Sequence, residues 1–148
     1  EGCITILNPA PARSIKKEDF LLIDFFTPNE TETEFYLNKK IESDQDIKDA
    51  GNEFLDKGIK NIIITLGSKG VYFANSNESY FIDALKLKSD VVDTTGAGDA
   101  FNGALSVALS KEYSYKDAIV FANKVGGIST TRVGAANAMP TLKEVESY

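Results

Sequence analysis

Two glycines and an aspartate stand close together in VVDTTGAGDAFNGAL, residues 91–105. Gly96 and Gly98 permit a sharp backbone turn and leave room for a ligand close to the main chain. A helix that begins after such a turn has N–H groups without intrahelical partners, and its dipole attracts an anion. We therefore expect the N–H groups of residues 97–100 to converge on one point suited to a phosphate. The Asp99 carboxylate would stand beside that point as a proton acceptor.

A helix is predicted directly after this turn, because the apolar residues then recur with a period near 3.6. They are Ala100, Phe101, Ala104, Leu105, Ala108 and Leu109. The alternative to a phosphate site is an ordinary glycine turn in which Asp99 only caps the helix. Two familiar phosphate motifs are excluded: G-x-x-x-x-G-K-[ST] is absent, and Phe101 replaces the third glycine of G-x-G-x-x-G. Neither a P-loop NTPase nor a dinucleotide-binding Rossmann unit is supported.

The composition of the chain excludes further classes of function. The 148 residues are 43% hydrophobic and 26% charged, enough for one domain with a sizeable core. A formal net charge of −6 without a basic stripe argues against a nucleic-acid partner. The sequence contains no histidine, which excludes Ser–His–Asp, Cys–His and histidine–metal chemistry.

Location and completeness can also be predicted. No apolar run approaches the ~20 residues that span a membrane, and no signal-peptide pattern is present. The lone Cys3 excludes an internal disulfide and fits a reducing compartment, so we expect a cytoplasmic protein without a membrane partner. The chain starts without Met and within a strand-like run, which suggests a piece of a longer protein.

Alternating strand and helix patterns predict an α/β fold with a mostly parallel sheet and one antiparallel hairpin. Strands are expected at residues 3–7, 23–27, 61–66, 71–74 and 80–82. Helices are expected at residues 16–23, 29–37, 43–58, 97–110, 115–128 and 141–148. The loops that begin near residues 8, 27, 67 and 93 each follow an apolar strand-like run. Because ligands bind beyond the carboxyl ends of parallel strands, these loops should converge on one edge of the sheet.

At this point the sequence resembles the ribokinase family of sugar kinases. The segments that carry the resemblance are NPAPA at 8–12, TPNETE at 27–32, TLGSKG at 65–70, DTTGAGDAFNGAL at 93–105 and RVGAANAMP at 132–140. They stand in the family's order and approximate spacing. The resemblance implies a three-layer α/β/α fold, with residues 1–148 as the C-terminal, ATP-binding part of a sugar kinase domain. The family's sugar-binding residues and lid lie mostly in the half that this chain lacks.

The resemblance also implies roles for individual residues. Asp99 matches the catalytic base, which accepts the proton of the attacking sugar hydroxyl. Gly96, Ala97 and Gly98 match the anion hole for the transferring phosphate. The nucleotide contacts implied are Asn29, Thr65, Leu66, Gly67, Ser68, Lys69, Gly70, Gly98 and Asn123. For these the alternatives are a plain hairpin entry at 65–70 and an exposed helix position at Asn123.

Two ion sites follow from the same resemblance. Asn29 and Glu32 match an N-x-x-E element that organises Mg²⁺ through water, and the alternative is an ordinary acidic helix start. A monovalent cation, K⁺, would be held mainly by backbone carbonyls. Its implied positions are Asp93, Thr95, Ser129, Arg132, Gly134 and Ala138. Ala138 stands where a hydroxyl residue is common, so one side-chain ligand is missing.

The implied reaction is the ATP-dependent phosphorylation of D-ribose at its 5-hydroxyl, giving ribose 5-phosphate. NPAPA, TPNETE and Asn102 favour a ribose kinase over a fructokinase or adenosine kinase. A fructokinase or nucleoside kinase of the same family remains the alternative within this class. A catalytically silent nucleotide-binding or interaction module is the alternative outside it. The family resemblance is compatible with a homodimer of the full-length protein.

Overall fold

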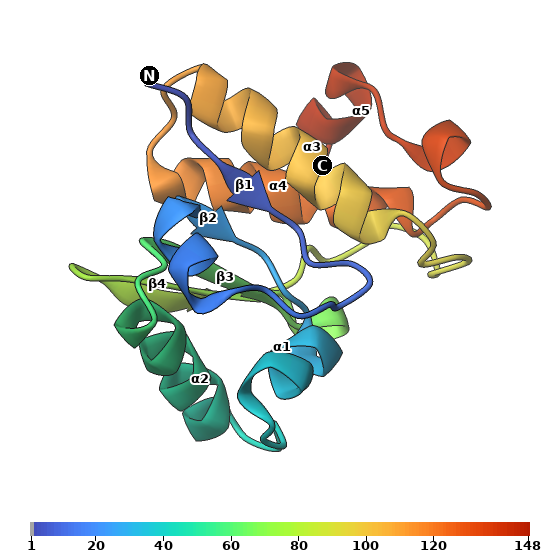
Figure 1. Ribbon diagram of the computed structural model, residues 1–148. Helices are drawn as coiled ribbons and strands as arrows, with labels where there is room; N and C mark the ends of the chain where they lie inside the picture. The colour runs from blue at the N-terminus through green and yellow to red at the C-terminus, as the bar shows by residue number, and fades with distance from the viewer. Residues whose placement is uncertain (1) are drawn as a thin grey trace. The chain divides into compact units, whose positions relative to one another are not determined.

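The computed structural model describes residues 2–148, which form two compact units that meet in sequence at Asp83 and Ala84 (Figure 1). The first unit holds a five-stranded sheet with its helices. The second unit is helical. Each unit carries some of the residues singled out above.

Residues 2–83, the described part of the first unit, contain nine short elements. They are β1 (Ile6–Leu7), η1 (Lys17–Leu22), β2 (Phe25–Phe26), α1 (Glu30–Leu37), α2 (Asp44–Asp56), β3 (Asn61–Thr65), η2 (Gly67–Lys69), β4 (Val71–Asn75) and β5 (Ser79–Ile82). The strands lie side by side in chain order, with β1, β2 and β3 parallel and β3, β4 and β5 antiparallel. The α/β class and the hairpin are confirmed. The sheet of these residues is mixed: the chain reverses at residues 67–70 between β3 and β4 and again between β4 and β5, so two of the four strand pairings are antiparallel.

The first two strands are shorter than predicted. The N–H of Thr5 donates to the Asp24 carboxylate at 2.8 Å, whereas the Thr5 carbonyl still accepts from the Phe25 N–H at 2.9 Å. Cys3 and Ile4 are exposed, which leaves only Ile6 and Leu7 paired with β2. The aromatic residues of β2 are fully buried and anchor the core.

Helices α1 and α2 begin at side-chain caps that the sequence indicates. Asn29 and Ser43 each accept a hydrogen bond from the N–H three residues on, and an acidic side chain bonds back in both cases. Such reciprocal caps satisfy two orphan donors at once. The α2 face then buries Ile47, Ala50 and Phe54 against β3 and β4.

The second unit contains α3 (Ala97–Ser110), α4 (Tyr115–Ser129), η3 (Ala136–Ala138) and α5 (Leu142–Glu146). Helices α3 and α4 pack along each other through small and apolar side chains such as Ala104, Leu105 and Ala122, all buried. A strand before the glycine turn was expected from Val91 and Val92. It does not form: residues 84–94 have neither helix nor strand, and both valines are 58% exposed. The N–H groups of Val92 and Asp93 donate instead to the Thr130 carbonyl.

No helix within residues 2–148 combines the length and apolar character needed to cross a membrane.

Candidate active site

Two loops of the first unit come together where parallel strands end. The N–H of Thr65, at the end of β3, donates to the Pro28 carbonyl at 2.9 Å, and Asn29 forms an isolated parallel bridge with Thr65. Lys69 lies 3.7 Å from a carboxylate oxygen of Glu30. The TPNETE and TLGSKG segments therefore lie side by side, as the convergence argument predicts for this unit.

Asn29 and Glu32 already form a complete capping box. The Asn29 N–H donates to Oε2 of Glu32 at 2.8 Å, and the Glu32 N–H donates to the Asn29 side chain at 2.8 Å. Glu32 is only 8% exposed. Both residues therefore cap the start of α1, which is the alternative given above for this acidic helix start. The other carboxylate oxygen of Glu32, Oε1, is the atom left for a water-mediated contact with an ion.

The loop at residues 65–70 is exposed at its tip, residues 67–69. The N–H of Leu66 donates to the Gly70 carbonyl at 2.8 Å, which closes the turn. Gly67 and Gly70 adopt φ values of 57° and 100°, in the left-handed region that favours glycine. Ser68 and Lys69, at the tip, are exposed, whereas Leu66 is buried. A ligand at this loop would meet backbone and the short Ser68 side chain.

The glycine turn of the second unit begins α3. Gly96 is the N-cap residue with φ 76°, and a Cβ there would lie 2.9 Å from that of Ala135. Two of the four N–H groups expected to be free are in fact used. Ala97 donates to the Thr94 carbonyl at 3.2 Å and Ala100 to the Gly96 carbonyl at 2.8 Å. Because these two N–H groups form bonds within the turn and the helix, the prediction of four free N–H groups at residues 97–100 was wrong.

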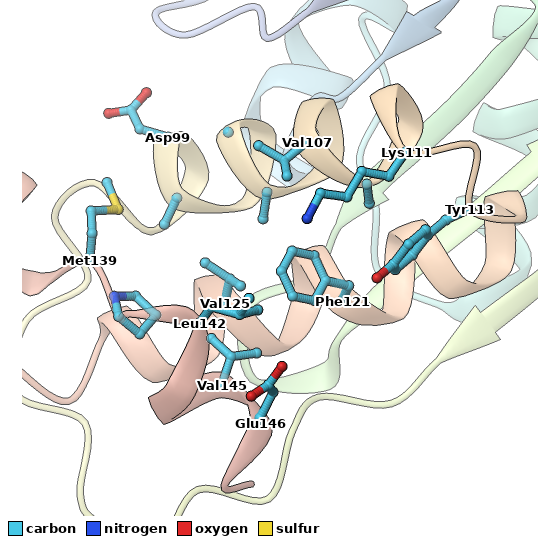
Figure 2. Close-up of a pocket in the computed structure, with 15 residues that line it drawn as sticks. Asp99, Val107, Lys111, Tyr113, Phe121, Val125, Met139, Leu142, Val145 and Glu146 are labelled. Atoms are coloured by element: carbon cyan, nitrogen blue, oxygen red, sulfur yellow. The ribbon is translucent and has the colours of Figure 1, made fainter.

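Two N–H groups remain available at this helix end. Within residues 2–148, those of Gly98 and Asp99 donate to no backbone or side-chain acceptor. Gly98 is exposed, has an ordinary helical backbone, and would have nothing within 4 Å of an added Cβ. Neither strain nor packing therefore explains a glycine at this position. The Asp99 side chain is exposed beside it, at one end of a groove in the second unit (Figure 2).

Asp93 connects the loop before the glycine turn with the loop after α4. Its Oδ2 accepts from the Gly134 N–H at 2.9 Å and its Oδ1 from the Thr95 N–H at 2.9 Å. The bond from the Gly134 N–H, followed by those from Thr95, holds the pKa of the Asp93 carboxyl below its usual value. Asp93 is therefore ionised and fixes residues 93–95 against Gly134.

The other implied cation positions have structural partners of their own. The buried Ser129 hydroxyl donates to the Gly126 carbonyl at 2.8 Å. Arg132 pairs with Glu144 of α5. Ala138 is buried and its N–H donates to the Ala135 carbonyl at 3.1 Å. A monovalent cation near these loops would rely on backbone carbonyls, and Thr95 is exposed in the same loop.

Some features of the site had no signal in the sequence. The hydrogen bond from Gly134 to Asp93 joins residues 41 apart, and the Arg132–Glu144 pair depends on how α5 folds back. Asn123 lies half-buried in α4, two turns before its end. The groove beside Asp99 is built from three helices whose contacts no local pattern predicts.

Comparison with known proteins places these features in a family. The family model described as "pfkB family carbohydrate kinase" matches residues 2–142. The chain belongs to the pfkB family of carbohydrate kinases.

Within that family the chain is similar to ribokinases. It is 44% identical to the ribokinase of Staphylococcus aureus over 97% of its own length and 47% of that protein. Its fold matches a ribokinase of Thermotoga maritima with a TM-score of 0.89 at 39% identity, covering 99% of this chain and 49% of that one. The Arabidopsis thaliana ribokinase, solved with ribose and ATP, matches with a TM-score of 0.92 at 30% identity, covering 99% and 47%. The chain thus spans about half the length of the relatives it matches.

Proposed function

We propose that this chain is the ATP-binding, base-carrying part of a ribokinase-type sugar kinase, which phosphorylates D-ribose at its 5-hydroxyl. One observation carries the proposal: the exposed Asp99 carboxylate adjoins two N–H groups without acceptors, at the start of α3. The similarity to ribokinases supports the choice of ribose. Fructose or a nucleoside is the alternative acceptor within the family.

The proposed chemistry uses Asp99 as general base. Its carboxylate accepts the proton of the sugar hydroxyl while the hydroxyl oxygen attacks the γ-phosphorus of ATP and the bond to ADP breaks. Phosphoryl transfer depends mainly on positioning and charge stabilisation, so the base needs chiefly to be well placed. The N–H groups of Gly98 and Asp99, with the α3 dipole, would stabilise the transferring phosphate. Gly96 and Ala97 shape the turn.

The nucleotide would contact main chain more than side chains. In the first unit, residues 67–69 are exposed, and Asn29 pairs with Thr65 at the start of the same loop. In the second unit, Asn123 is the position implied for the adenine. These assignments rest on the family resemblance together with the exposure of the glycine turns.

The residues present fit the two ions to different degrees. Within residues 2–148 no cluster of three acidic, Cys or His side chains would enclose a metal. Mg²⁺ needs few carboxylates because it keeps several waters, so Oε1 of Glu32 fits a water-mediated contact. Mg²⁺ would neutralise phosphate charge. K⁺ fits the carbonyls near Asp93 and Gly134, where it would add positive charge close to the glycine turn.

The decisive experiment is turnover of D-ribose by the longer kinase that this proposal implies, with Asp99→Asn against the parent. We expect kcat to fall by about 10²–10⁴-fold, the usual worth of a general base, with little change in ATP affinity. Ser106→Ala, at an exposed position two turns along α3, is the control for general disturbance of the helix. Near-normal kcat in Asp99→Asn would remove Asp99 from the role of base. A panel of ribose, fructose and adenosine distinguishes the acceptors, and inactivity on all three would favour the silent module.

A further inference from the structure

The half-buried Asn102 side chain contacts the first turn of its own helix, α3. Its Nδ2 donates a hydrogen bond to the Gly98 carbonyl oxygen at 2.8 Å. The Gly98 carbonyl and the Asp99 N–H are the two ends of one planar peptide group. Within residues 2–148, that N–H is one of the two at the start of α3 that have no acceptor. Asn102 therefore holds the carbonyl end of a peptide group whose N–H end is open to a ligand.

The pairing of the helix itself does not require this bond. Along an α-helix each carbonyl accepts the backbone N–H four residues on, so the Gly98 carbonyl already faces the Asn102 N–H. The side chain is a second donor to the same oxygen. Asn is also a poorer helix former than Ala, and side chains that bond to nearby backbone compete with the helix. The consequence of the bond therefore falls on the peptide group between residues 98 and 99.

A similar bond one turn further along α3 provides a comparison. The Ser106 Oγ donates to the Asn102 carbonyl at 2.8 Å, again four residues back. The N–H of that peptide group belongs to Gly103, which lies inside the helix and faces the Asp99 carbonyl. A donor at the Asn102 carbonyl therefore cannot act on a ligand through this peptide group. The bond also shows that a serine hydroxyl at this spacing reaches the carbonyl.

We propose that Asn102 is a positioning residue for phosphoryl transfer, which fixes the 98–99 peptide group and strengthens its N–H as a donor to the transferring phosphate. This inference rests on the proposed function. A hydrogen bond to a carbonyl polarises the peptide group and strengthens the bond made by its N–H, by about 10–30%. Preorganised donors act most strongly where charge develops in the transition state. Loss of the Asn102 amide therefore lowers kcat and leaves the affinity for ATP nearly unchanged.

The kinetic test uses the longer kinase with D-ribose and compares three variants with the parent. Asn102→Ala should lower kcat by at least about threefold, well short of the ~10²–10³-fold loss when a donor is removed outright, with KM for ATP nearly unchanged. Asn102→Ser should recover most of this loss, because its hydroxyl can donate to the Gly98 carbonyl as Ser106 donates to the Asn102 carbonyl. Ser106→Ala deletes the comparison bond and should stay within about twofold of the parent, as surface changes usually do.

A second measurement needs no catalysis. The amide proton chemical shift of Asp99, measured by NMR on the isotope-labelled chain, reports the polarisation of its peptide group, because a hydrogen bond at the carbonyl deshields the N–H proton. Asn102→Ala should move this signal upfield, and Asn102→Ser should return it towards its position in the parent. Ser106→Ala should leave it in place. Thermal unfolding of each variant checks that it is folded.

Four results would overturn the proposal. An Asp99 amide signal that does not move in Asn102→Ala would do so whether or not the protein phosphorylates ribose. A loss confined to thermal stability, with unchanged kcat, would assign Asn102 a purely structural role. Equal impairment of Asn102→Ala and Asn102→Ser would show that a donor to Gly98 is not what matters. A raised KM for ribose at unchanged kcat would place Asn102 against the acceptor instead. Failure of the proposed function is a separate result, since near-normal kcat in Asp99→Asn shows it whatever Asn102 does.

Discussion

At the scale of single residues, a substitution at Gly98 tests the proposed phosphate contact separately from folding. Gly98→Ala adds a methyl group into open space on an ordinary helical backbone. Because Ala is a better helix former, we expect the free energy of unfolding to stay unchanged or rise by up to about 1 kcal/mol. The methyl group would stand where a phosphate approaches the N–H groups, so binding of an ATP analogue with Mg²⁺ should weaken by at least about tenfold, or 1.4 kcal/mol.

Calorimetric titration and urea unfolding measure the two effects of Gly98→Ala separately. Gly103→Ala is the control, because Gly103 lies in the same helix and its added Cβ also meets nothing within 4 Å. It should gain similar stability and bind the analogue normally. Unaltered analogue binding by Gly98→Ala would remove this turn from the phosphate site.

Two residues earlier, the backbone conformation and the close approach of Ala135 require a glycine at position 96. A Cβ at Gly96 would meet Ala135 at 2.9 Å, and the φ of 76° is unfavourable for any L side chain. Left-handed backbone alone costs about 1–2 kcal/mol, so Gly96→Ala should lower the free energy of unfolding by at least that amount. Urea unfolding beside Gly98→Ala checks the contrast. A neutral Gly96→Ala would mean that the turn relaxes and does not set the start of α3.

At the scale of elements, an ion pair between Glu144 and Arg132 connects α5 with the loop at residues 132–140. The Thr141 N–H bond, followed by the Arg132 guanidinium, lowers the pKa of Glu144 from 4.5 to about 2. A carboxyl whose pKa is lowered by folding stabilises the fold when ionised. This stabilisation is complete above about pH 4.5 and is lost as the pH falls towards 2.

The prediction concerns the pH dependence of stability. Glu144→Gln should destabilise the chain at pH 6, and its difference from the parent should shrink steadily between pH 4.5 and 2. Thermal unfolding across that range measures the difference. Glu146→Gln, in the same helix and without a hydrogen bond or ion pair within residues 2–148, should show no such trend. A constant difference at all pH values would show that the ionised Glu144 has no special role.

Some elements of this fold could be predicted from the sequence, and others could not. Helices with clear caps and periodic apolar faces, such as α2 and α3, were predicted to within a residue or two. The strand expected near Val91 does not form, because a β-branched segment becomes a strand only where another strand is available to pair with it. Of the four N–H groups expected to be free at 97–100, two are used: Ala97 bonds within the turn, which no spacing rule reveals, and Ala100 forms the first helical bond, to Gly96. The groove depends on packing among three helices, which is a long-range property.

At the scale of the whole molecule, net charge opposes the proposed ligand. The chain carries −6 at pH 7, and ATP is itself an anion. If the proposal holds, binding comes from short-range contacts such as those of the Gly98 and Asp99 N–H groups. At 0.1 M salt, repulsion between charges more than about 10 Å apart is largely screened, whereas such short contacts are weakened much less.

This balance predicts an unusual salt dependence. Raising choline chloride from 0.05 to ~0.3 M, spanning Debye lengths on either side of about 10 Å, with K⁺ and Mg²⁺ held constant, should leave the affinity for an ATP analogue unchanged or slightly higher. Duplex DNA should not bind at the low-salt end, where a basic surface would bind it most tightly. Calorimetry for the nucleotide and a gel-shift assay for the DNA measure both. An affinity for the analogue that falls tenfold or more over this range would show a basic phosphate site, and the glycine turn of α3 would then not be the principal anion-binding element.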